Sequence, residues 1–322
     1  MKNNESVAEK TRKLLKLCKD TYFSGVHLVV TGHDKPDSDS LISAWLLLRL
    51  LSKKDIIAEI KFATRPDSVT AKIAQKLGIL DVMNFGGFDE GDVLLLVDHH
   101  KTFYKNRVLG CIDHHTTPPE PDFNYSFVEK ASSCGKMIFD MMCSIGSDDS
   151  ESEIMALYSV YFDTQSCKSS KFNQNDREWI EYCIEKYSLD RDCLTEWGYC
   201  LSDPEDSVRE LAMAGYKRYE FSGKAGISSC VQTNIRRSRM IEKRLPEIFE
   251  FLDDYMRVNN VFVCVYIVNN PEIGRSDMYI IKEGNVPLDE RIEKISLDRL
   301  ASRSVDVVPY VKRMAESEST TE

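Results

Sequence analysis

A chain of 322 residues is longer than one small hydrophobic core requires, and its length favours about two domains. Its net charge of −10 argues against a nucleic-acid duplex as a partner, because phosphate-backbone binding usually shows as a basic excess. The N-terminal residues lack the apolar run of a signal peptide, and the apolar stretches 44–51 and 261–268 are too short to span a bilayer. The ten cysteines lack paired spacing, as is typical of reduced thiols. We therefore expect a cytoplasmic protein that does not contact a membrane.

The first half of the chain alternates between helical and strand-like segments. Residues 6–22 carry spaced apolar positions among charged ones and predict an amphipathic helix. The apolar run 26–30 predicts a buried strand, which a long apolar helix follows from about 40 to 53. The next expected elements are a strand at 56–62, a helix at 71–77 and buried strands at 93–97 and 108–112. Apolar strands separated by helices predict a parallel sheet covered on both faces, whose ligands bind beyond the C-terminal strand ends.

From about residue 208 the pattern changes. It predicts a short helix, a strand near 226–231, a charged helix at 236–258, an apolar strand at 261–268 and a strand at 278–282. The predicted fold is therefore α/β with two domains. A parallel-sheet domain occupies residues 1–190, with an N-terminal helix within 1–25. A second, smaller mixed α/β domain occupies residues 205–322.

Five of the six histidines fall in three clusters that also contain aspartate. The clusters span 31–39, 97–100 and 112–115, and each directly follows a predicted strand. They should therefore meet at one edge of the sheet. A fourth candidate, Asp163, ends the apolar segment 154–162. A lone Asp-His pair is usually a helix cap or a surface turn, but three clusters that use nearly all the histidine are poorly explained in that way.

The residue types in these clusters predict a centre for metal ions. Imidazole and carboxylate groups bind borderline-hard divalent ions such as Mn²⁺ without any thiolate. Asp37 and Asp39 are two residues apart, so we expect both to point into one space from an extended turn and one to serve each of two ions. Crowded carboxylates repel one another and lose hydration, which is costly unless cations neutralise them.

The same motifs resemble the four signatures of DHH phosphoesterases in residue type, order and spacing across residues 26–175. They read His33-x-x-x-Asp37-x-Asp39, then Asp98-His99, then Asp113-His114-His115, then Asp163. Within that superfamily the chain is most similar to the family II inorganic pyrophosphatases, with yeast-type exopolyphosphatases and prune proteins nearby. The presence of His33 favours the pyrophosphatases, because the nearby relatives tend to carry Asn at that position.

The resemblance implies two divalent metal ions, with Mn²⁺ favoured and Mg²⁺ or Co²⁺ as alternatives. The ligands of the first ion would be His33, Asp37 and Asp98. The ligands of the second ion would be Asp39, Asp98, His114 and Asp163. Asp98 would bridge the two ions, and the resemblance counts it and His114 among the catalytic residues. His115 would face the substrate phosphate as an acid or hydrogen-bond donor, and His99 would support the ligands.

Two C-terminal segments resemble the DHH-associated, substrate-binding domain. Within 213–227 the resemblance places a phosphate-binding lysine at Lys217. Within 300–309 it places a phosphate clamp at Ser302 and Arg303. Ser304 stands where the family clamp has a lysine, so one cation of the clamp is missing from the sequence.

Other positions also depart from the pyrophosphatase pattern. Cys230 replaces a glutamine and His100 replaces an asparagine. The turn 132–135 resembles the exopolyphosphatase and prune pattern and suggests substrate contacts, although a plain helix cap fits equally well. Lys168 and Lys171, which follow Asp163, either add positive charge at the rim of the site or are solvated surface lysines.

These observations predict metal-dependent hydrolysis of a small phosphate substrate, inorganic pyrophosphate or polyphosphate, to orthophosphate. His33 favours pyrophosphate, whereas Ser304 and the turn 132–135 favour a longer chain. One alternative is a phosphodiesterase acting on cyclic dinucleotides or short oligonucleotides, but the glycine-rich loop of those enzymes is not found after residue 205. Another is a prune-like protein that mainly binds partners. The sequence does not predict the oligomeric state or the physiological metal.

Overall fold

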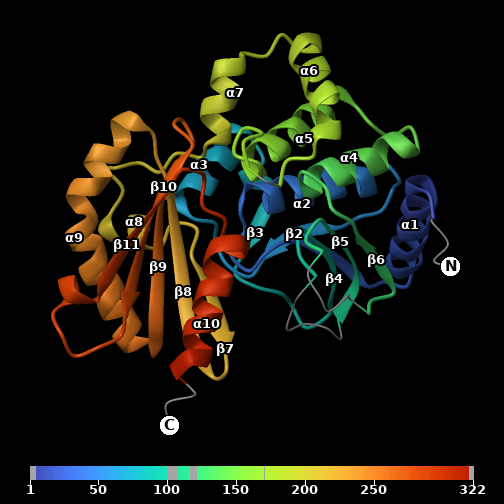
Figure 1. Ribbon diagram of the computed structural model, residues 1–322. Helices are drawn as coiled ribbons and strands as arrows, with labels where there is room; N and C mark the ends of the chain where they lie inside the picture. Colours follow the sequence, from blue (N-terminus) through green and yellow to red (C-terminus); the bar gives the residue numbers. More distant parts are fainter. Residues whose placement is uncertain (1–4, 101–106, 117–121, 170, 319–322) are drawn as a thin grey trace. The chain divides into compact units, whose positions relative to one another are not determined.

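The computed structural model describes residues 5–100, 107–116, 122–169 and 171–318 (Figure 1). The chain forms two compact units, Met1–Gly198 and Tyr199–Glu322. A six-stranded sheet lies in the first unit and a five-stranded sheet in the second. The predicted fold class, a parallel-sheet α/β unit followed by a smaller mixed α/β unit, is confirmed. Within the residues described, no helix combines the length and apolar character needed to cross a bilayer.

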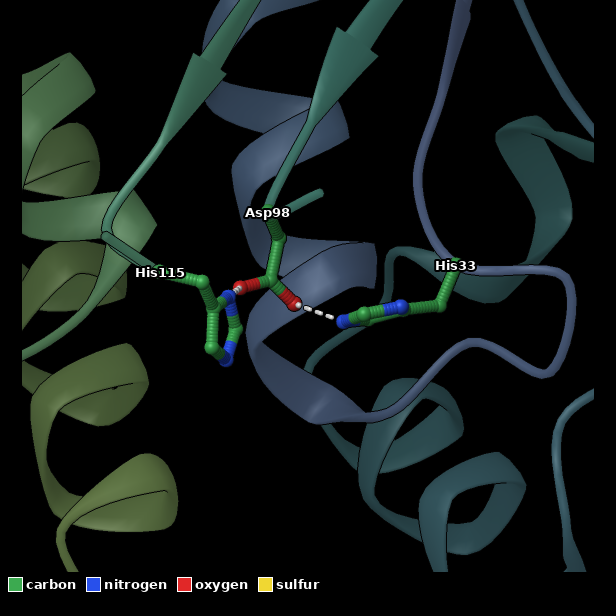
Figure 2. Close-up of side chains that lie close together, drawn as sticks. All are labelled: His33, Asp98 and His115. Carbon is green, nitrogen blue, oxygen red and sulfur yellow. Dashed lines mark ion pairs between the residues drawn. The ribbon is translucent and has the colours of Figure 1, made fainter. Parts of the chain in front are cut away.

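The sheet of the first unit is entirely parallel and has the strand order β3-β2-β1-β4-β5-β6. Its strands are β1 (His27–Thr31), β2 (Glu59–Phe62), β3 (Met83–Phe85), β4 (Asp92–Val97), β5 (Val108–Asp113) and β6 (Tyr125–Val128). The chain proceeds outward in one direction from β1 and in the other from β4. The C-terminal ends of these two neighbours therefore form the switch point at which ligands of such sheets bind. His33 and Asp98 leave the sheet there, and His115 leaves from β5 alongside (Figure 2).

The helices of the first unit are α1 (Val7–Phe23), α2 (Ser38–Ser52), α3 (Ser68–Lys76), α4 (Cys134–Ser144), α5 (Ser150–Asp163), α6 (Arg177–Lys186) and α7 (Arg191–Gly198). Helix α2 is buried along most of its length and packs against α4 and α5. Its apolar sequence predicted that burial, but it begins two residues earlier than expected. The carboxylate of Asp37 accepts a hydrogen bond from the Ser40 backbone N–H and caps the helix. The predicted extended turn is therefore wrong for Asp39, which lies in the first turn of α2.

The second unit has the strand order β11-β10-β9-β8-β7, with β8 and β9 parallel and the other neighbours antiparallel. Its elements are α8 (Val208–Ala212), β7 (Lys217–Phe221), β8 (Lys224–Gln232), α9 (Ile235–Val258), β9 (Val261–Asn270), β10 (Arg275–Lys282), β11 (Ile292–Leu297) and α10 (Val308–Glu318). Strands β7 and β11 were not predicted. Both are edge strands with half-exposed side chains, so they lack the apolar runs that mark β8 and β9.

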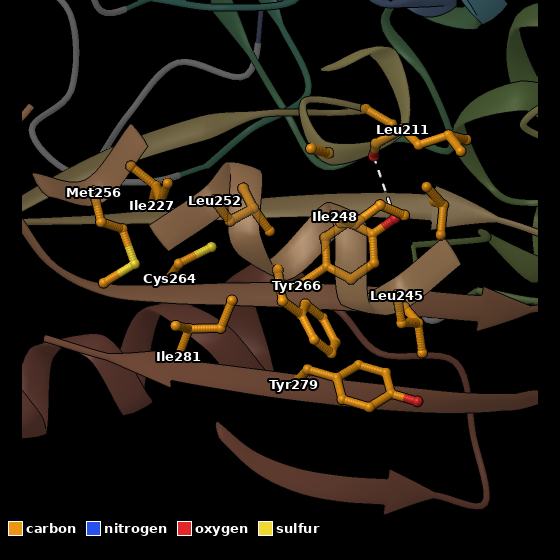
Figure 3. Packing of buried hydrophobic residues seen from close by; sticks show 14 of the residues in the cluster. Leu211, Ile227, Leu245, Ile248, Leu252, Met256, Cys264, Tyr266, Tyr279 and Ile281 are labelled. Carbon is orange, nitrogen blue, oxygen red and sulfur yellow. Dashed lines mark hydrogen bonds between the residues drawn. The ribbon is translucent and has the colours of Figure 1, made fainter. Parts of the chain in front are cut away.

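Helix α9 crosses from β8 to β9 and packs an apolar face on the sheet (Figure 3). The residues of this face recur at helical spacing and are Ile241, Leu245, Ile248, Leu252 and Met256. On the sheet side the ring of Tyr266 is fully buried, and its hydroxyl donates a hydrogen bond of 3.3 Å to the carbonyl of Leu211. This bond satisfies the one polar group that the ring brings into the core.

A buried ion pair joins α9 to the segment before β11. Arg291 Nη1 and Nη2 donate to Asp253 Oδ1 and Oδ2 at 2.7 and 3.0 Å, and these side chains are only 9% and 4% exposed. The hydrogen bonds from Arg291 lower the pKa of Asp253, although burial opposes the shift. Arg257 also bonds to Asp253, but its side chain is 66% exposed.

We predict that Arg291→Ala lowers the free energy of unfolding of the second unit by about 3 kcal/mol, because Asp253 stays buried after losing its bidentate partner. Arg257→Ala is the matched control, since it removes a solvent-exposed partner of the same carboxylate. Its effect should stay below about 1 kcal/mol. Urea unfolding of the full chain measures both changes, and equal losses for the two variants would contradict this ranking.

Candidate metal centre

The candidate centre is built at the C-terminal ends of three adjacent strands. Asp98 follows β4 directly, His114 and His115 follow β5 directly, and His33 lies two residues beyond β1. Asp39 reaches the same place from the first turn of α2. Because β1, β4 and β5 are parallel neighbours, these loops must emerge side by side. The sequence clusters therefore meet in space as predicted.

Asp98 occupies an unusual backbone conformation. Its φ is +63°, in the left-handed region that Asp and Asn enter more readily than other non-glycine residues. The turn is held by the Asp98 N–H, which donates 2.9 Å to the carbonyl of Ile112, and by Ser40 Oγ, which donates 2.6 Å to Asp98 Oδ2. The carboxylate is 1% exposed. The chain therefore turns sharply at the end of β4, and this turn places the Asp98 carboxylate in the interior.

Asp39, Asp98 and His114 form one group of potential metal ligands. All three are buried, and their ligand atoms lie within 4.8 Å of one another. His114 Nε2 is 3.2 Å from Asp98 Oδ1 and 3.7 Å from Asp39 Oδ2. His114 Nδ1 lies 3.2 Å from the carbonyl of Ala131, which can only accept, so Nδ1 carries the proton in the neutral ring. The lone pair of Nε2 then faces the carboxylate oxygens.

This arrangement fits a cation. Asp98 Oδ1 and His114 Nε2 are buried, and among the described residues neither atom makes a hydrogen bond, although they lie close together. Buried polar atoms are nearly always satisfied, so these two atoms require a shared partner between them, either a proton or a cation. A divalent ion bound by imidazole and carboxylate satisfies both.

His33, Asp98 and His115 form a second such group, again within 4.8 Å (Figure 2). His33 Nε2 lies 3.5 Å from Asp98 Oδ2, whereas His115 Nδ1 lies 3.8 Å from Asp98 Oδ1. Asp98 is the member shared by both groups. His99 packs against this group, with its ring stacked on that of His33 at a centroid distance of 5.3 Å, and its Nδ1 is 3.0 Å from the carbonyl of Val97.

Two further predicted ligands, Asp37 and Asp163, lie nearby but outside both groups. Asp37 caps α2, and its charge still acts on Asp98. Asp163 ends α5 with Oδ2 3.7 Å from His114 Nε2. Both of its oxygens accept hydrogen bonds from Lys171 Nζ, at 2.6 and 3.0 Å. Asp37 and Asp163 therefore have partners of their own in this structure.

The predicted phosphate-binding residues belong to the second unit. Lys217 is the first residue of β7. Arg303 donates from Nη1 to the carbonyl of Gly215 at 2.5 Å. The backbone N–H of Ser302 donates to the Asp306 carboxylate at 2.7 Å. The side chain of Ser304 lies outside the described part of the chain.

The residues that hold Asp39 were not predicted from the sequence. Its Oδ1 accepts from Ser159 Oγ at 2.5 Å, from Ser43 Oγ at 3.1 Å and from the Gly135 N–H at 3.0 Å, while Oδ2 accepts from the Cys134 N–H at 2.8 Å. Helix α4 thus gives its first two N–H groups to Asp39. The occurrence of a single serine in the apolar run 154–162 was the one available signal for Ser159.

Asp113 orients the third histidine cluster. It is fully buried and accepts from both the backbone N–H and Nδ1 of His115, each at 2.9 Å. Its other oxygen lies 2.5 Å from His100 Nδ1. Burial opposes ionisation of Asp113, but the hydrogen bonds and charge of His115, together with His100, hold its pKa well below the usual value. His100, which departs from the family pattern, thus serves as a second donor to this carboxylate.

The electrostatics of the centre show the repulsion expected of crowded carboxylates. Burial raises the pKa of Asp98 well above its usual value, and the charges of Asp39 and Asp37 raise it further. Burial also raises the pKa of Asp39, against the effect of His114. Burial disfavours the charged form of His114, but Asp98, Asp163 and Asp39 raise its pKa to about 10. Protons and a bound cation therefore compete for the same ligand atoms.

Comparison with known proteins places this geometry in a family context. Residues 27–161 match the DHH family, N-terminal domain. A manganese-dependent inorganic pyrophosphatase of Methanocaldococcus jannaschii is 22% identical, over 88% of this chain and 98% of the relative. An Archaeoglobus fulgidus protein provisionally assigned the same activity is 25% identical, over 89% of this chain and 98% of its own length.

A solved structure shares the fold. A crystal structure from Methanococcus jannaschii, provisionally assigned as a family II inorganic pyrophosphatase, matches with a TM-score of 0.71 and 19% sequence identity. The match covers 90% of this chain and 99% of that one. The likeness therefore extends over both units of the chain, including the part beyond the DHH match.

We predict that Asp98→Asn stabilises the protein at pH 7 in the presence of a chelator by about 1–2 kcal/mol while abolishing tight Mn²⁺ binding. Because the pKa of Asp98 is raised in the folded state, its contribution to folding stability is fully present below its unfolded pKa of about 4. That contribution is lost as the pH rises through the raised folded-state pKa. Asparagine removes this loss and tolerates the left-handed φ.

Thermal unfolding in chelator and calorimetric titration with Mn²⁺ test the prediction. Asp34→Asn is the matched control, because Asp34 is an exposed acid of the same loop as His33. It should change stability by less than about 0.5 kcal/mol. A destabilised Asp98→Asn protein that still binds Mn²⁺ would refute the electrostatic account of this centre.

Proposed function

We propose that this chain is a manganese-dependent hydrolase of phosphoanhydride bonds. Its substrate would be inorganic pyrophosphate and its product orthophosphate. The proposal starts from the match of residues 27–161 to the DHH family, N-terminal domain. The observation that carries the proposal is the pair of ligand groups that share the buried Asp98 at the sheet edge. The two relatives that match most of this chain are named for this activity and metal, the second of them provisionally.

The proposed ligands follow the family resemblance. His33, Asp37 and Asp98 would hold one ion. Asp39, Asp98, His114 and Asp163 would hold the other. Bound Mn²⁺ ions supply an activated water and neutralise charge on the phosphate oxygens, and Mg²⁺ or Co²⁺ could replace them. The close approach of Asp39, Asp98 and His114 supports the second set, and the close approach of His33 to Asp98 supports the first.

His115 would act on the substrate phosphate. The Asp113 carboxylate lies against its Nδ1 and favours a proton there, so Nε2 is the ring atom left to exchange a proton with the substrate. The imidazole is about one-third exposed, unlike the buried His114. Protonated at Nε2, it can hydrogen-bond a phosphate oxygen and give its proton to the departing phosphate.

Ser302, Arg303 and Lys217 would bind the substrate phosphates. A guanidinium presents five N–H donors, and the described contacts of Arg303 use one of them. Arginine suits two-point contact with a phosphate, whereas lysine acts as a point charge. Ser304 in place of the clamp lysine leaves this set one cation short.

Pyrophosphate is favoured over polyphosphate by two observations. The first is the presence of His33. The second is that the turn 132–135 already has partners within the protein, because Ser133 caps α4 and the N–H groups of Cys134 and Gly135 bind Asp39. That turn therefore gives no support for contacts with a longer chain, and Ser304 alone still favours one. We also propose a cytoplasmic location, which the ten free cysteines support.

The activity test is phosphate release by the purified protein with Mn²⁺ or Mg²⁺ from pyrophosphate, tripolyphosphate and long polyphosphate in parallel. We expect fast release from pyrophosphate and none from Asp98→Ala, which loses the residue common to both ligand groups. Preference for long chains would make the protein an exopolyphosphatase. Bound metal without release from any of the three would refute the proposed reaction and favour a diesterase or a partner-binding protein.

We predict that Arg303→Ala reduces kcat/KM for pyrophosphate by at least about tenfold, the effect of losing one charged hydrogen bond, and leaves Mn²⁺ content unchanged. Arg275→Ala is the control, because Arg275 is an exposed arginine of the same unit that pairs with Asp298. Steady-state kinetics and elemental analysis measure the two quantities. Loss of bound Mn²⁺ in Arg303→Ala would contradict its assignment to the substrate.

A further inference from the structure

We propose that Lys171 is a built-in competitor of the metal ion at Asp163, so that its ammonium group and a divalent ion bind this carboxylate alternately. The inference rests on the proposed metal-dependent function and adds a residue that sets the affinity of the second ion. It starts from one contact. Lys171 Nζ donates to both oxygens of Asp163, at 2.6 and 3.0 Å.

That contact excludes simultaneous metal binding through the same lone pairs. An ammonium that bonds both oxygens of a carboxylate occupies the side on which a cation would bind. Asp163 Oδ2 is 3.7 Å from His114 Nε2, so the carboxylate already faces the ligand atoms of the centre. For Asp163 to join Asp39, Asp98 and His114 on an ion through the lone pairs that the lysine now occupies, Lys171 must release at least one oxygen.

The lysine is the partner that can move. Its side chain is 44% exposed, whereas that of Asp163 is 11% exposed and fixed at the end of α5. A lysine side chain is a flexible four-carbon stem carrying a strongly hydrated charge. Moving into solvent therefore restores the hydration of the ammonium, while the carboxylate stays beside the centre.

The backbone reverses direction after α5, and this reversal returns Lys171 to Asp163. Gln165, Ser166 and Cys167 follow one another at φ +50°, +57° and +64°, a run of left-handed residues that contains no glycine. The Thr164 carbonyl accepts from the N–H groups of Lys168 and Ser169 at 3.0 and 2.9 Å, and the buried Thr164 Oγ1 accepts from the Cys167 N–H. This reversal lets Lys171 contact Asp163 eight residues earlier.

An ordinary surface ion pair does not describe this contact. Such pairs join two solvated groups and contribute little. Here the acid is nearly buried, and its carboxylate lies with those of Asp39 and Asp98 within 3.7 Å of His114 Nε2, so three carboxylates crowd one place. Lys171 supplies a positive charge to that set. A divalent ion supplies the same compensation, so the two cations substitute for each other.

The first test is calorimetric titration of the chelator-treated full chain with Mn²⁺. Lys171→Met, which removes the charge and keeps the length, should tighten binding of the weaker ion about tenfold, equivalent to about 1.4 kcal/mol. Lys171→Arg should stay close to wild type. Lys168→Met removes an equal charge three residues away and should also stay close to wild type.

Unchanged or weaker binding by Lys171→Met overturns the inference. Equal tightening by Lys168→Met also overturns it, because the effect would then belong to the general field and not to the contact. If the wild-type protein binds no Mn²⁺, the proposed metal-dependent function fails and this inference fails with it. Wild-type binding with no change in Lys171→Met affects the lysine inference alone.

A second test uses the unaltered protein and does not depend on how the variants fold. Brief acetylation of surface lysines, followed by peptide mass spectrometry, compares chelator-treated and Mn²⁺-loaded protein. Lys171 should become several-fold more reactive on loading, because the ion displaces it from Asp163, while Lys186, which pairs with Glu153 away from the ligand groups, serves as the reference. Equal or lower reactivity of Lys171 after loading contradicts the exchange.

Discussion

The burial of Asp39 and Asp98 side by side is the constraint on which the rest of the first unit depends. Two carboxylates at 2% and 1% exposure lose nearly all of their hydration and repel each other. Neutral donors offset part of the loss, through Ser40 on Asp98 and through Ser43 and Ser159 on Asp39. The remaining imbalance is what gives the site its preference for cations over any neutral ligand.

Two helices contribute to this compensation through their N-terminal ends. Asp39 sits in the first turn of α2, and the first N–H groups of α4 point at the same carboxylate from the other side. The partial positive charge of a helix N-terminus stabilises an anion placed there. Gly135 allows the approach, because a Cβ at that position would come within 2.3 Å of Ser159 Oγ. The packing of α2, α4 and α5 therefore also positions the groups that hold the Asp39 carboxylate.

The parts of this structure that could be predicted are those encoded by short stretches of chain. A histidine or aspartate directly after an apolar strand marks a strand end, so the meeting of His33, Asp98 and His114 follows from the parallel sheet. The contacts that could not be predicted join distant segments: Ser159 lies 120 residues from Asp39. The start of α2 was also missed, because Asp37 was interpreted as a metal ligand alone, whereas its carboxylate also caps the helix and fixes where it begins. Strands β7 and β11 escaped notice because half-exposed edges carry no apolar signal.

The left-handed backbone at Asp98 limits how this centre can evolve. At φ +63° a β-branched or bulky side chain is strained, so the turn after β4 favours aspartate, asparagine, histidine or glycine. Asparagine and glycine offer no charged ligand atom, and a neutral imidazole has one free lone pair, so none of them replaces a carboxylate shared by both ligand groups. Diversification of metal preference in descendants of this fold should accordingly appear first at His33 and at His115, whose φ angles lie outside that restricted region, with the central aspartate kept.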